Sequence, residues 1–195
     1  MFYEYIRILK EVKPEYFVLE NVVSMSPGNK KLINENIGFD PIVIDAQLVS
    51  AQRRKRLFWV GKLVGDKYER VTISQPLDKG ILLKDILQKT VDEKYILLDS
   101  TVRRLTNNGE GFHSKIVSDG KSSTLMAGMA KNCRGMSLIE YWDRHRKLTP
   151  IECLRLQSLP DDYLNDSIPD TQKYKMVGNS FNCGVIEHLL QEVLK

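Results

Sequence analysis

The order of apolar and helical segments at the start of this 195-residue chain limits its possible folds more than any other feature. The first fourteen residues carry apolar side chains at helical spacing, and Pro14 ends that pattern. Phe17-Val18-Leu19 then forms an apolar run of the length and character of a buried parallel strand. We expect this strand to end at Glu20-Asn21, which would place a carboxylate where open α/β sheets bind their ligands.

Further strands are expected after one more helix. A polar loop at 27–29 is followed by a short helix that Gly38 closes, and residues 41–45 and 57–63 have the pattern of strands. A strand, helix, strand succession favours an α/β layer over a helical bundle. We therefore predict an α/β fold with a partial doubly wound sheet. The strand at 17–19 is expected to be central and parallel in the complete sheet, with the other two as an antiparallel edge pair.

The middle of the chain has weak periodicity, and regular order returns near residue 148. Residues 65–147 are rich in Gly, Asn and Ser, and a short helical piece is predicted at 82–87. A helix start follows: Thr149 has the position of the cap, Pro150 that of the first helical residue, and Glu152 that of the acid in a capping box. We divide the chain at these changes into residues 1–64, a small irregular region at 65–147, and C-terminal helices at 148–195.

Charge and cysteine content restrict the class of protein. The net charge is +4, but residues 101–147 hold nine Lys or Arg and four Asp or Glu, which gives this segment +5. Such a segment suits a polyanion, and it equally suits a solvated loop; on the first interpretation Arg103 and Arg104 would contact DNA. The three cysteines are scattered without metal-ligand spacing, so we expect reduced thiols, a cytoplasmic protein and no metal. No apolar run is long enough for a membrane span.

Two polar stretches beside predicted strands are candidates for chemistry. A Glu after a buried strand, as in Glu20-Asn21-Val22, can share a proton with a bound base, although alone it more often just ends a strand. The stretch Gln52 to Arg56 offers planar guanidinium groups to phosphates and carbonyl oxygens. Taken alone, it equally fits a basic loop that keeps an edge strand soluble.

Two further stretches lie near the C-terminus. The capped helix from Thr149 runs to Leu159-Pro160-Asp161-Asp162-Tyr163, and taken alone it is only a well-made helix and turn. Gly178-Asn179-Ser180 precedes the last helix, where backbone amides can bind a carboxylate or phosphate, or simply form a helix cap.

In order and spacing, these four stretches together resemble the DNA cytosine-5 methyltransferases. Glu-Asn-Val and Gln-x-Arg-x-Arg before Leu-Phe-Trp-Val are similar to two central motifs of that family. The stretch Leu-Thr-Pro-x-Glu-Cys-x-Arg-Leu-Gln-x-x-Pro-Asp-x-Tyr resembles its penultimate motif, and Tyr-Lys-x-x-Gly-Asn-Ser its last. The weakly patterned middle then occupies the place of the target-recognition region. The resemblance implies a Rossmann-like, S-adenosylmethionine-dependent methyltransferase sheet and a flipped cytosine in double-stranded DNA as substrate.

The resemblance also implies roles for individual residues. Glu20, with Asn21 beside it, would be catalytic and contact the ring nitrogen and amino group of the cytosine, and Arg56 would reach its carbonyl oxygen. Gln52 and Arg54 would organise the loop and the contacts to the DNA backbone. Gly178, Asn179 and Ser180 would line the methionine end of S-adenosylmethionine, which leaves as S-adenosylhomocysteine, with Gly178 permitting a tight turn.

Two motifs of the family are missing from these 195 residues. Neither the Phe-x-Gly-x-Gly cofactor loop nor the Pro-Cys nucleophile loop is present, and none of the three cysteines follows a proline. Ile151 also stands where many relatives have Arg. We therefore expect this chain to be the C-terminal part of a methyltransferase, inactive without its N-terminal half. The absence of that half would leave the apolar face of the last helix, at Val185, Ile186, Leu189 and Val193, uncovered. The alternative is a catalytically dead homologue that binds DNA or a partner. The target sequence is not predicted.

Overall fold

A computed structural model describes residues 2–107, 113–117 and 119–195, which form two compact units. The first unit comprises Met1–Asp45, Lys55–Pro76 and His188–Lys195, and the second comprises Ala46–Arg54 and Leu77–Glu187. The elements of the first unit are α1 (Phe2–Val12), β1 (Tyr16–Val22), α2 (Pro27–Ile37), β2 (Ile42–Asp45), β3 (Lys55–Val64), β4 (Lys67–Arg70) and the end of α7 (Cys183–Val193).

The sheet of the first unit has the order β1-β3-β2, and β4 also pairs with β3. Every pairing is antiparallel, so the expected antiparallel pair of 41–45 and 57–63 is confirmed. β3 is the inner strand, and β1 has a strand partner on one side only among the described residues. The predicted parallel and central place of β1 concerns the complete sheet and stays a prediction. β1 also continues to Val22, so Glu20 and Asn21 lie inside the strand rather than beyond its end.

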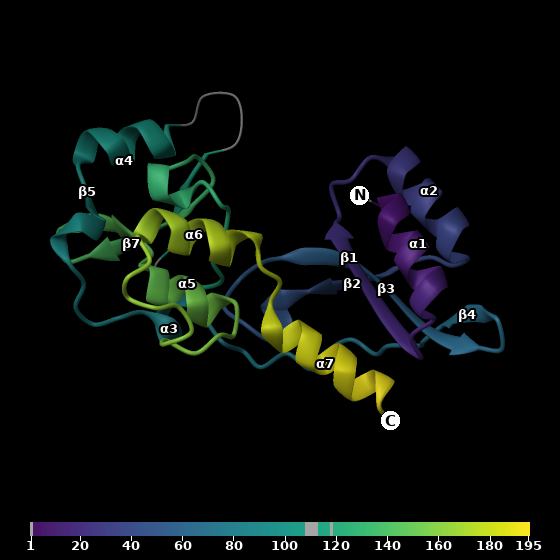
Figure 1. The fold of residues 1–195 in the computed structure, drawn as a ribbon. Coiled ribbons are helices and arrows are strands. Elements are labelled where there is room, and N and C mark those ends of the chain that lie inside the picture. Colours follow the sequence, from purple (N-terminus) through teal and green to yellow (C-terminus); the bar gives the residue numbers. More distant parts are fainter. Residues whose placement is uncertain (1, 108–112, 118) are drawn as a thin grey trace. The chain divides into compact units, whose positions relative to one another are not determined.

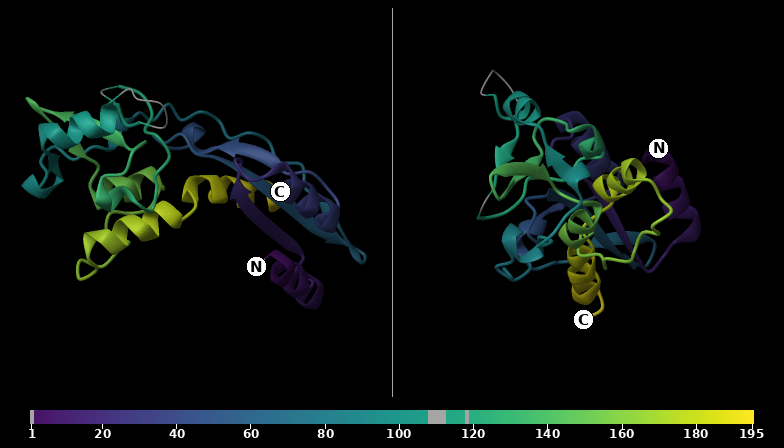
Figure 2. Two further views of the ribbon diagram at one scale, coloured as in Figure 1. Left: turned by 90° about the horizontal axis from the view of Figure 1, so that it is seen from above. Right: turned by 90° about the vertical axis from the view of Figure 1, so that its left-hand side faces the viewer.

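One face of this sheet is covered by α1 and α2 (Figures 1 and 2). The two-residue alternation of a strand turns Phe17 and Trp59 to this face, where they pack with Ile6 and Ile33 of the helices. α2 begins at Pro27, inside the stretch that we expected to be a loop, because Ser26 caps it by accepting from the Asn29 amide at 3.2 Å. Gly38 ends α2 at a φ of 97°, as its position predicted.

The second unit contains more regular structure than its weak periodicity indicated. Its strands have only two to five residues each, which is too short to give a clear sequence pattern. Their sheet has the order β5-β8-β7-β6. The elements are η1 (Ala46–Leu48), α3 (Leu83–Ile86), η2 (Glu93–Tyr95), β5 (Ile96–Leu97), α4 (Asp99–Thr106), β6 (Lys115–Ile116), η3 (Met129–Lys131), β7 (Ser137–Tyr141), β8 (Arg144–Lys147), α5 (Pro150–Leu156), α6 (Asp170–Asn179) and the start of α7.

The predicted helix start at Thr149 is confirmed. The Thr149 hydroxyl accepts from the Glu152 amide at 3.2 Å, and the Glu152 carboxylate accepts from the Thr149 amide at 2.9 Å. α5 packs against α6, and Leu154 and Leu156 of α5 are buried in the core of the unit. None of the described helices is long and apolar enough to cross a membrane.

The expectation of an uncovered apolar face on α7 is wrong. Val185, Leu189 and Val193 are 3%, 0% and 8% exposed, and Ile186 is partly buried. In the first unit the end of α7 is held by Ser74, whose hydroxyl donates to the Glu192 carboxylate at 2.8 Å. The helix therefore finds its apolar contacts within this chain.

Candidate catalytic and cofactor-binding residues

Glu20 and Arg56 meet on one face of the sheet in the first unit. In the register of β1 and β3, Glu20 lies opposite Phe58 and Arg56 lies opposite Val22, so the two side chains are diagonal neighbours on the same face. The Arg56 Nε atom is 2.8 Å from a Glu20 carboxylate oxygen, and the two side chains are 15% and 29% exposed. The pair is thus fixed by strand register yet open to a ligand.

Asn21 faces the other side of the sheet from Glu20, because successive strand residues alternate. Its neighbour across the sheet is Leu57, which belongs to the core beneath α1 and α2. The Asn21 side-chain oxygen accepts from the Val22 amide at 2.8 Å. The structure therefore does not bring Asn21 to the Glu20–Arg56 pair, and the geometry gives it a role in shaping the end of the strand.

Gln52 and Arg54 are buried inside the second unit, where they join three segments of backbone. The Gln52 amide group accepts from the Leu125 amide at 2.9 Å and donates to the Leu156 carbonyl at 3.1 Å. The Arg54 guanidinium donates to the carbonyls of Leu125 at 3.2 Å and Ser180 at 2.6 Å. With exposures of 0% and 5%, neither side chain presents a surface to DNA phosphates. Their contacts are those of residues that position a loop.

Gln157 belongs to the same buried network, although sequence reasoning did not single it out. Its side-chain amide donates to the Val177 carbonyl at 2.9 Å, and its side-chain oxygen accepts from Gln52 at 3.3 Å. Its own carbonyl accepts from the Cys183 amide at the start of α7 at 2.9 Å. The sequence signal that could have indicated this role is the place of Gln157 in the Cys-x-Arg-Leu-Gln stretch of the penultimate motif.

Gly178 and Asn179 form the last turn of α6, so this segment is not a loop before a helix. Gly178 is helical, and its glycine is required by close packing: a Cβ there would lie 2.5 Å from the Ala127 nitrogen and 2.6 Å from the Met126 carbonyl carbon. The expected tight turn at Gly178 is therefore replaced by a close approach of two backbones. The Ser180 amide donates to the Met176 carbonyl at 3.0 Å, and the Asn179 side chain is exposed.

The start of α7 is not an open anion site, because its backbone groups are satisfied within the second unit. The Asn182 side chain accepts from the Val185 amide at 3.1 Å, and it donates to the Leu156 carbonyl at 2.8 Å. Burial raises the pKa of the Cys133, Cys153 and Cys183 thiols, whereas an activated thiol has a lowered pKa. Cys153 is buried, and Cys133 and Cys183 are partly exposed.

A second Glu–Arg pair lies in the core of the second unit. Both Arg146 terminal nitrogens donate to Glu152 at 2.8 Å, and the two side chains are 1% and 0% exposed. The Glu152 carboxylate also accepts from the amides of Gln88 at 2.8 Å and Thr149 at 2.9 Å. This pair ties β8 to α5 and leaves no room for a ligand.

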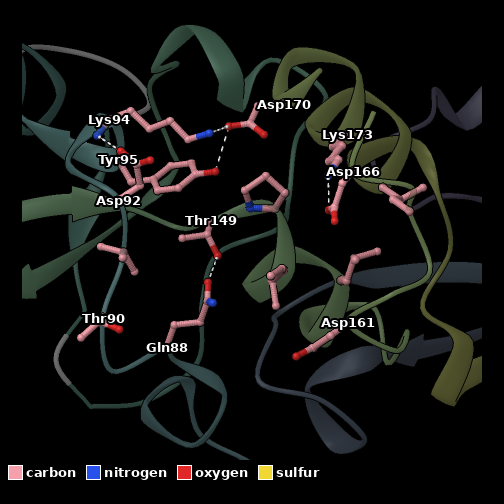
Figure 3. Close-up of a pocket in the computed structure, with 15 residues that line it drawn as sticks. Gln88, Thr90, Asp92, Lys94, Tyr95, Thr149, Asp161, Asp166, Asp170 and Lys173 are labelled. Carbon is pink, nitrogen blue, oxygen red and sulfur yellow. Dashed lines mark hydrogen bonds and ion pairs between the residues drawn. The ribbon is translucent and has the colours of Figure 1, made fainter. Parts of the chain in front are cut away.

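A cavity of about 520 Å³ in the second unit is lined in part by Gln88 and Thr149 (Figure 3). Its polar groups bind one another: Tyr95 donates to Asp170 at 2.8 Å, and Lys94 lies 2.9 Å from the same carboxylate. Burial acts to raise the pKa of Asp170, but hydrogen bonds from Lys94 and Tyr95 outweigh it and hold that pKa below its usual value. Among the described residues no group of His, Cys, Asp or Glu has the arrangement of a metal site.

Comparisons with known proteins cover the whole chain. The family model of the C-5 cytosine-specific DNA methylases matches residues 1–195. The chain is 30% identical to the Type II methyltransferase M.SsoII of Shigella sonnei over all of this chain and 56% of that protein. It is 29% identical to M1.ScrFI of Lactococcus lactis subsp. cremoris, over all of this chain and 55% of that protein.

Solved structures show the same fold at lower identity. The Dnmt2 methyltransferase of S. pombe superposes with a TM-score of 0.75 at 18% identity, over 99% of this chain and 71% of that one. DNMT2 of Spodoptera frugiperda gives 0.72 at 18% identity, over 100% and 71%. The chain therefore has the fold of these methyltransferases. This chain belongs to the C-5 cytosine-specific DNA methylase family, and it spans about half the length of the curated relatives named above.

Proposed function

We propose that this chain supplies the base-recognition half of a DNA cytosine-5 methyltransferase, acting in bacterial restriction–modification. The observation that supports this most is the Glu20–Arg56 pair, held by strand register and partly exposed. In this proposal a cytosine flipped out of the duplex lies against the pair, since its target carbon is inaccessible within the stack.

The two side chains would act on charge that develops in the ring. When a nucleophile adds to carbon 6, electron density moves onto the ring nitrogen and the carbonyl oxygen of cytosine. Glu20 would share a proton with the ring nitrogen, and Arg56 would donate to the carbonyl oxygen. The register of β1 and β3 holds the two side chains next to each other, so a bound base would meet both groups together.

The second unit would hold the cofactor side of the site. S-adenosylmethionine supplies the methyl group when bound and leaves as S-adenosylhomocysteine. Asn179 and Ser180 would contact its methionine end, and the exposed Asn179 side chain fits a hydrogen bond to a carboxylate or amine. Gln52 and Arg54 are assigned as positioning residues, because they fix Leu125 and Ser180 rather than face a ligand.

The nucleophile and the glycine-rich cofactor loop would come from an N-terminal half, either encoded in the same gene or supplied as a separate subunit. None of the three cysteines follows a proline, and burial raises the pKa of each thiol. The same observations favour a second candidate, a catalytically dead homologue that binds DNA or a partner. Either protein would act in the bacterial cytoplasm, where double-stranded DNA is found.

A complementation experiment separates the two candidates. The purified chain is mixed with an N-terminal half that carries the Pro-Cys and Gly-rich loops, taken from its own gene neighbourhood or from M.SsoII, and transfer of labelled methyl groups to cytosine in DNA is measured. We expect no transfer by the chain alone and transfer by the mixture. Transfer by the chain alone would refute the missing-nucleophile account. Failure with every N-terminal half that binds the chain would favour the dead homologue.

A further inference from the structure

We propose that Lys121 is a positioning residue for the cofactor side of the proposed site. Its ammonium group holds the buried loop that carries Gln52 and Arg54, and Arg54 in turn holds the carbonyl of Ser180. All of these residues belong to the second unit. The proposal rests on the proposed function, which assigns Asn179 and Ser180 to S-adenosylmethionine, and it adds a residue that none of the four motifs contains.

The Lys121 ammonium group lies among three backbone carbonyls. It donates to the carbonyl oxygens of Gln47 at 2.7 Å, Ser50 at 3.1 Å and Ile81 at 2.5 Å. An ammonium group has three donors and no acceptor, so these contacts use its full hydrogen-bonding capacity. Hydrogen bonds from a charged donor are stronger than those between neutral groups. Lys121 therefore joins two turns of one segment to a second segment of the same unit.

The loop at residues 46–54, which follows β2 and precedes β3, is largely buried. Within it Ser50 and Gln52 are 2% and 0% exposed. Loops usually run over the surface, because buried backbone groups without a partner are costly. In this loop the Lys121 ammonium is the donor for the carbonyls of Gln47 and Ser50. Removing that donor leaves two polar groups without this partner beside a buried segment.

The residue after Lys121 binds the same loop further along. The Ser122 amide donates to the Ala51 carbonyl at 2.7 Å, and the Arg53 amide donates to the Ser122 carbonyl at 2.9 Å. The two segments run parallel at this point, where Gln52 forms a bridge with Ser122. Lys121 thus anchors the first part of the loop and Ser122 its second part, so the side chains that follow project from a fixed backbone.

Arg54, the last residue of the loop, connects it to the proposed cofactor segment. Its guanidinium donates to the Ser180 carbonyl at 2.6 Å and to the Gly178 carbonyl at 3.3 Å. Asn179 stands between these two residues in the sequence, so the loop holds the backbone on both sides of the side chain proposed to contact the cofactor. A small displacement of such a group costs binding and rate. Lys121 therefore acts on Asn179 through the loop and Arg54.

Hydrogen–deuterium exchange of the purified 195-residue chain tests the anchoring of the loop. Lys121→Met keeps the apolar stem and removes the ammonium group, so the carbonyls of Gln47 and Ser50 lose their donor. We expect amide exchange in peptides that cover residues 46–54 to become at least about tenfold faster. Exchange in α2 of the first unit should stay unchanged, because the effect is local.

Lys84→Met is the matched control, because Lys84 is a lysine of the same unit that pairs with Asp119 at 3.3 Å on the surface. It should leave exchange in the loop unaltered. Lys121→Arg keeps a cation with several donors and should protect the loop better than Lys121→Met. Loop exchange as slow in Lys121→Met as in Lys84→Met overturns the anchoring role, and so does a uniform rise in exchange over the whole chain.

The link to the cofactor is tested with the chain complemented by an N-terminal half. We expect Lys121→Met to raise the KM for S-adenosylmethionine and the Kd of S-adenosylhomocysteine, measured by calorimetry, about tenfold, with the KM for DNA changed less than about twofold. A variant that only folds less well lowers the amount of active enzyme and leaves these constants unchanged. An unchanged Kd for S-adenosylhomocysteine overturns the link.

The two measurements separate this proposal from the proposed function. Exchange in the loop does not depend on methyl transfer or on an N-terminal half. Failed complementation together with faster loop exchange in Lys121→Met would reject the proposed function and leave the anchoring role standing. Successful complementation with unchanged loop exchange would do the reverse.

Discussion

The two Glu–Arg pairs of this chain have the same chemistry and very different surroundings. Glu20 and Arg56 in the first unit are 29% and 15% exposed, and a single 2.8 Å contact joins them. Glu152 and Arg146 in the second unit are 0% and 1% exposed, and two contacts of 2.8 Å join them. The first pair comes from diagonal positions on two strands, whereas the second joins a strand to a helix cap.

This difference separates a pair that can exchange partners from one that cannot. The Glu152 carboxylate accepts four hydrogen bonds, from the Arg146 guanidinium and from the amides of Gln88 and Thr149, so its capacity is filled inside the fold. Removing one member of a buried pair leaves a charge without compensation. Glu20 is partly hydrated already, so a ligand can replace water at modest cost. Burial, rather than residue type, separates the pair proposed to contact cytosine from the pair that stabilises the fold.

The largest effect is expected from breaking the buried pair. Glu152→Gln leaves the Arg146 charge buried without its counter-charge, so the free energy of unfolding should fall by about 3–5 kcal/mol. The measurement is chemical denaturation of the purified chain. Glu93→Gln is the matched control, since Glu93 pairs with Arg144 at 2.7 Å on the surface and should contribute less than about 1 kcal/mol. Equal losses in the two variants would contradict the distinction between the pairs.

A smaller loss is expected where two backbones pack against each other in the second unit. Gly178→Ala places a methyl group 2.5 Å from the Ala127 nitrogen, so the free energy of unfolding should fall by about 1–3 kcal/mol. Gly28→Ala is the control, because Gly28 is also helical and nothing lies within 4 Å of its added Cβ. That change should be neutral or stabilising by up to about 1 kcal/mol. Equal free energies of unfolding for Gly178→Ala and Gly28→Ala would contradict the close approach of the two backbones at Gly178.

The sequence predicted those parts of the fold that depend on local signals. The capping box at Thr149, the Gly38 helix end and the strands at 41–45 and 57–63 follow from residue types at fixed offsets, and the structure confirms them. The short strands β5, β6, β7 and β8 were missed because two to five residues give too little alternation to detect. These strands form by pairing between segments distant in the sequence, and no local pattern indicates such pairing.

The candidate site was likewise predicted only in the part that local sequence motifs indicate. The motifs pointed to Glu20 and Arg56, and strand register brings these two residues together. No sequence feature indicated that Arg54 is buried while Arg56, two residues later, is partly exposed, because that depends on the Leu125 and Ser180 carbonyls folding around it. Gly178 was identified correctly as constrained, but for the wrong reason: its constraint is a neighbouring backbone rather than its own φ.

The effect of Glu20→Gln tests the central claim, that the exposed pair serves the reaction and the buried pair serves the fold. Methyl transfer by the chain complemented with an N-terminal half, and unfolding of the chain alone, are measured for Glu20→Gln and Glu152→Gln. We predict that Glu20→Gln slows transfer at least about a hundredfold while the free energy of unfolding changes by less than about 1 kcal/mol. Unaltered transfer by the folded Glu20→Gln variant would contradict the account.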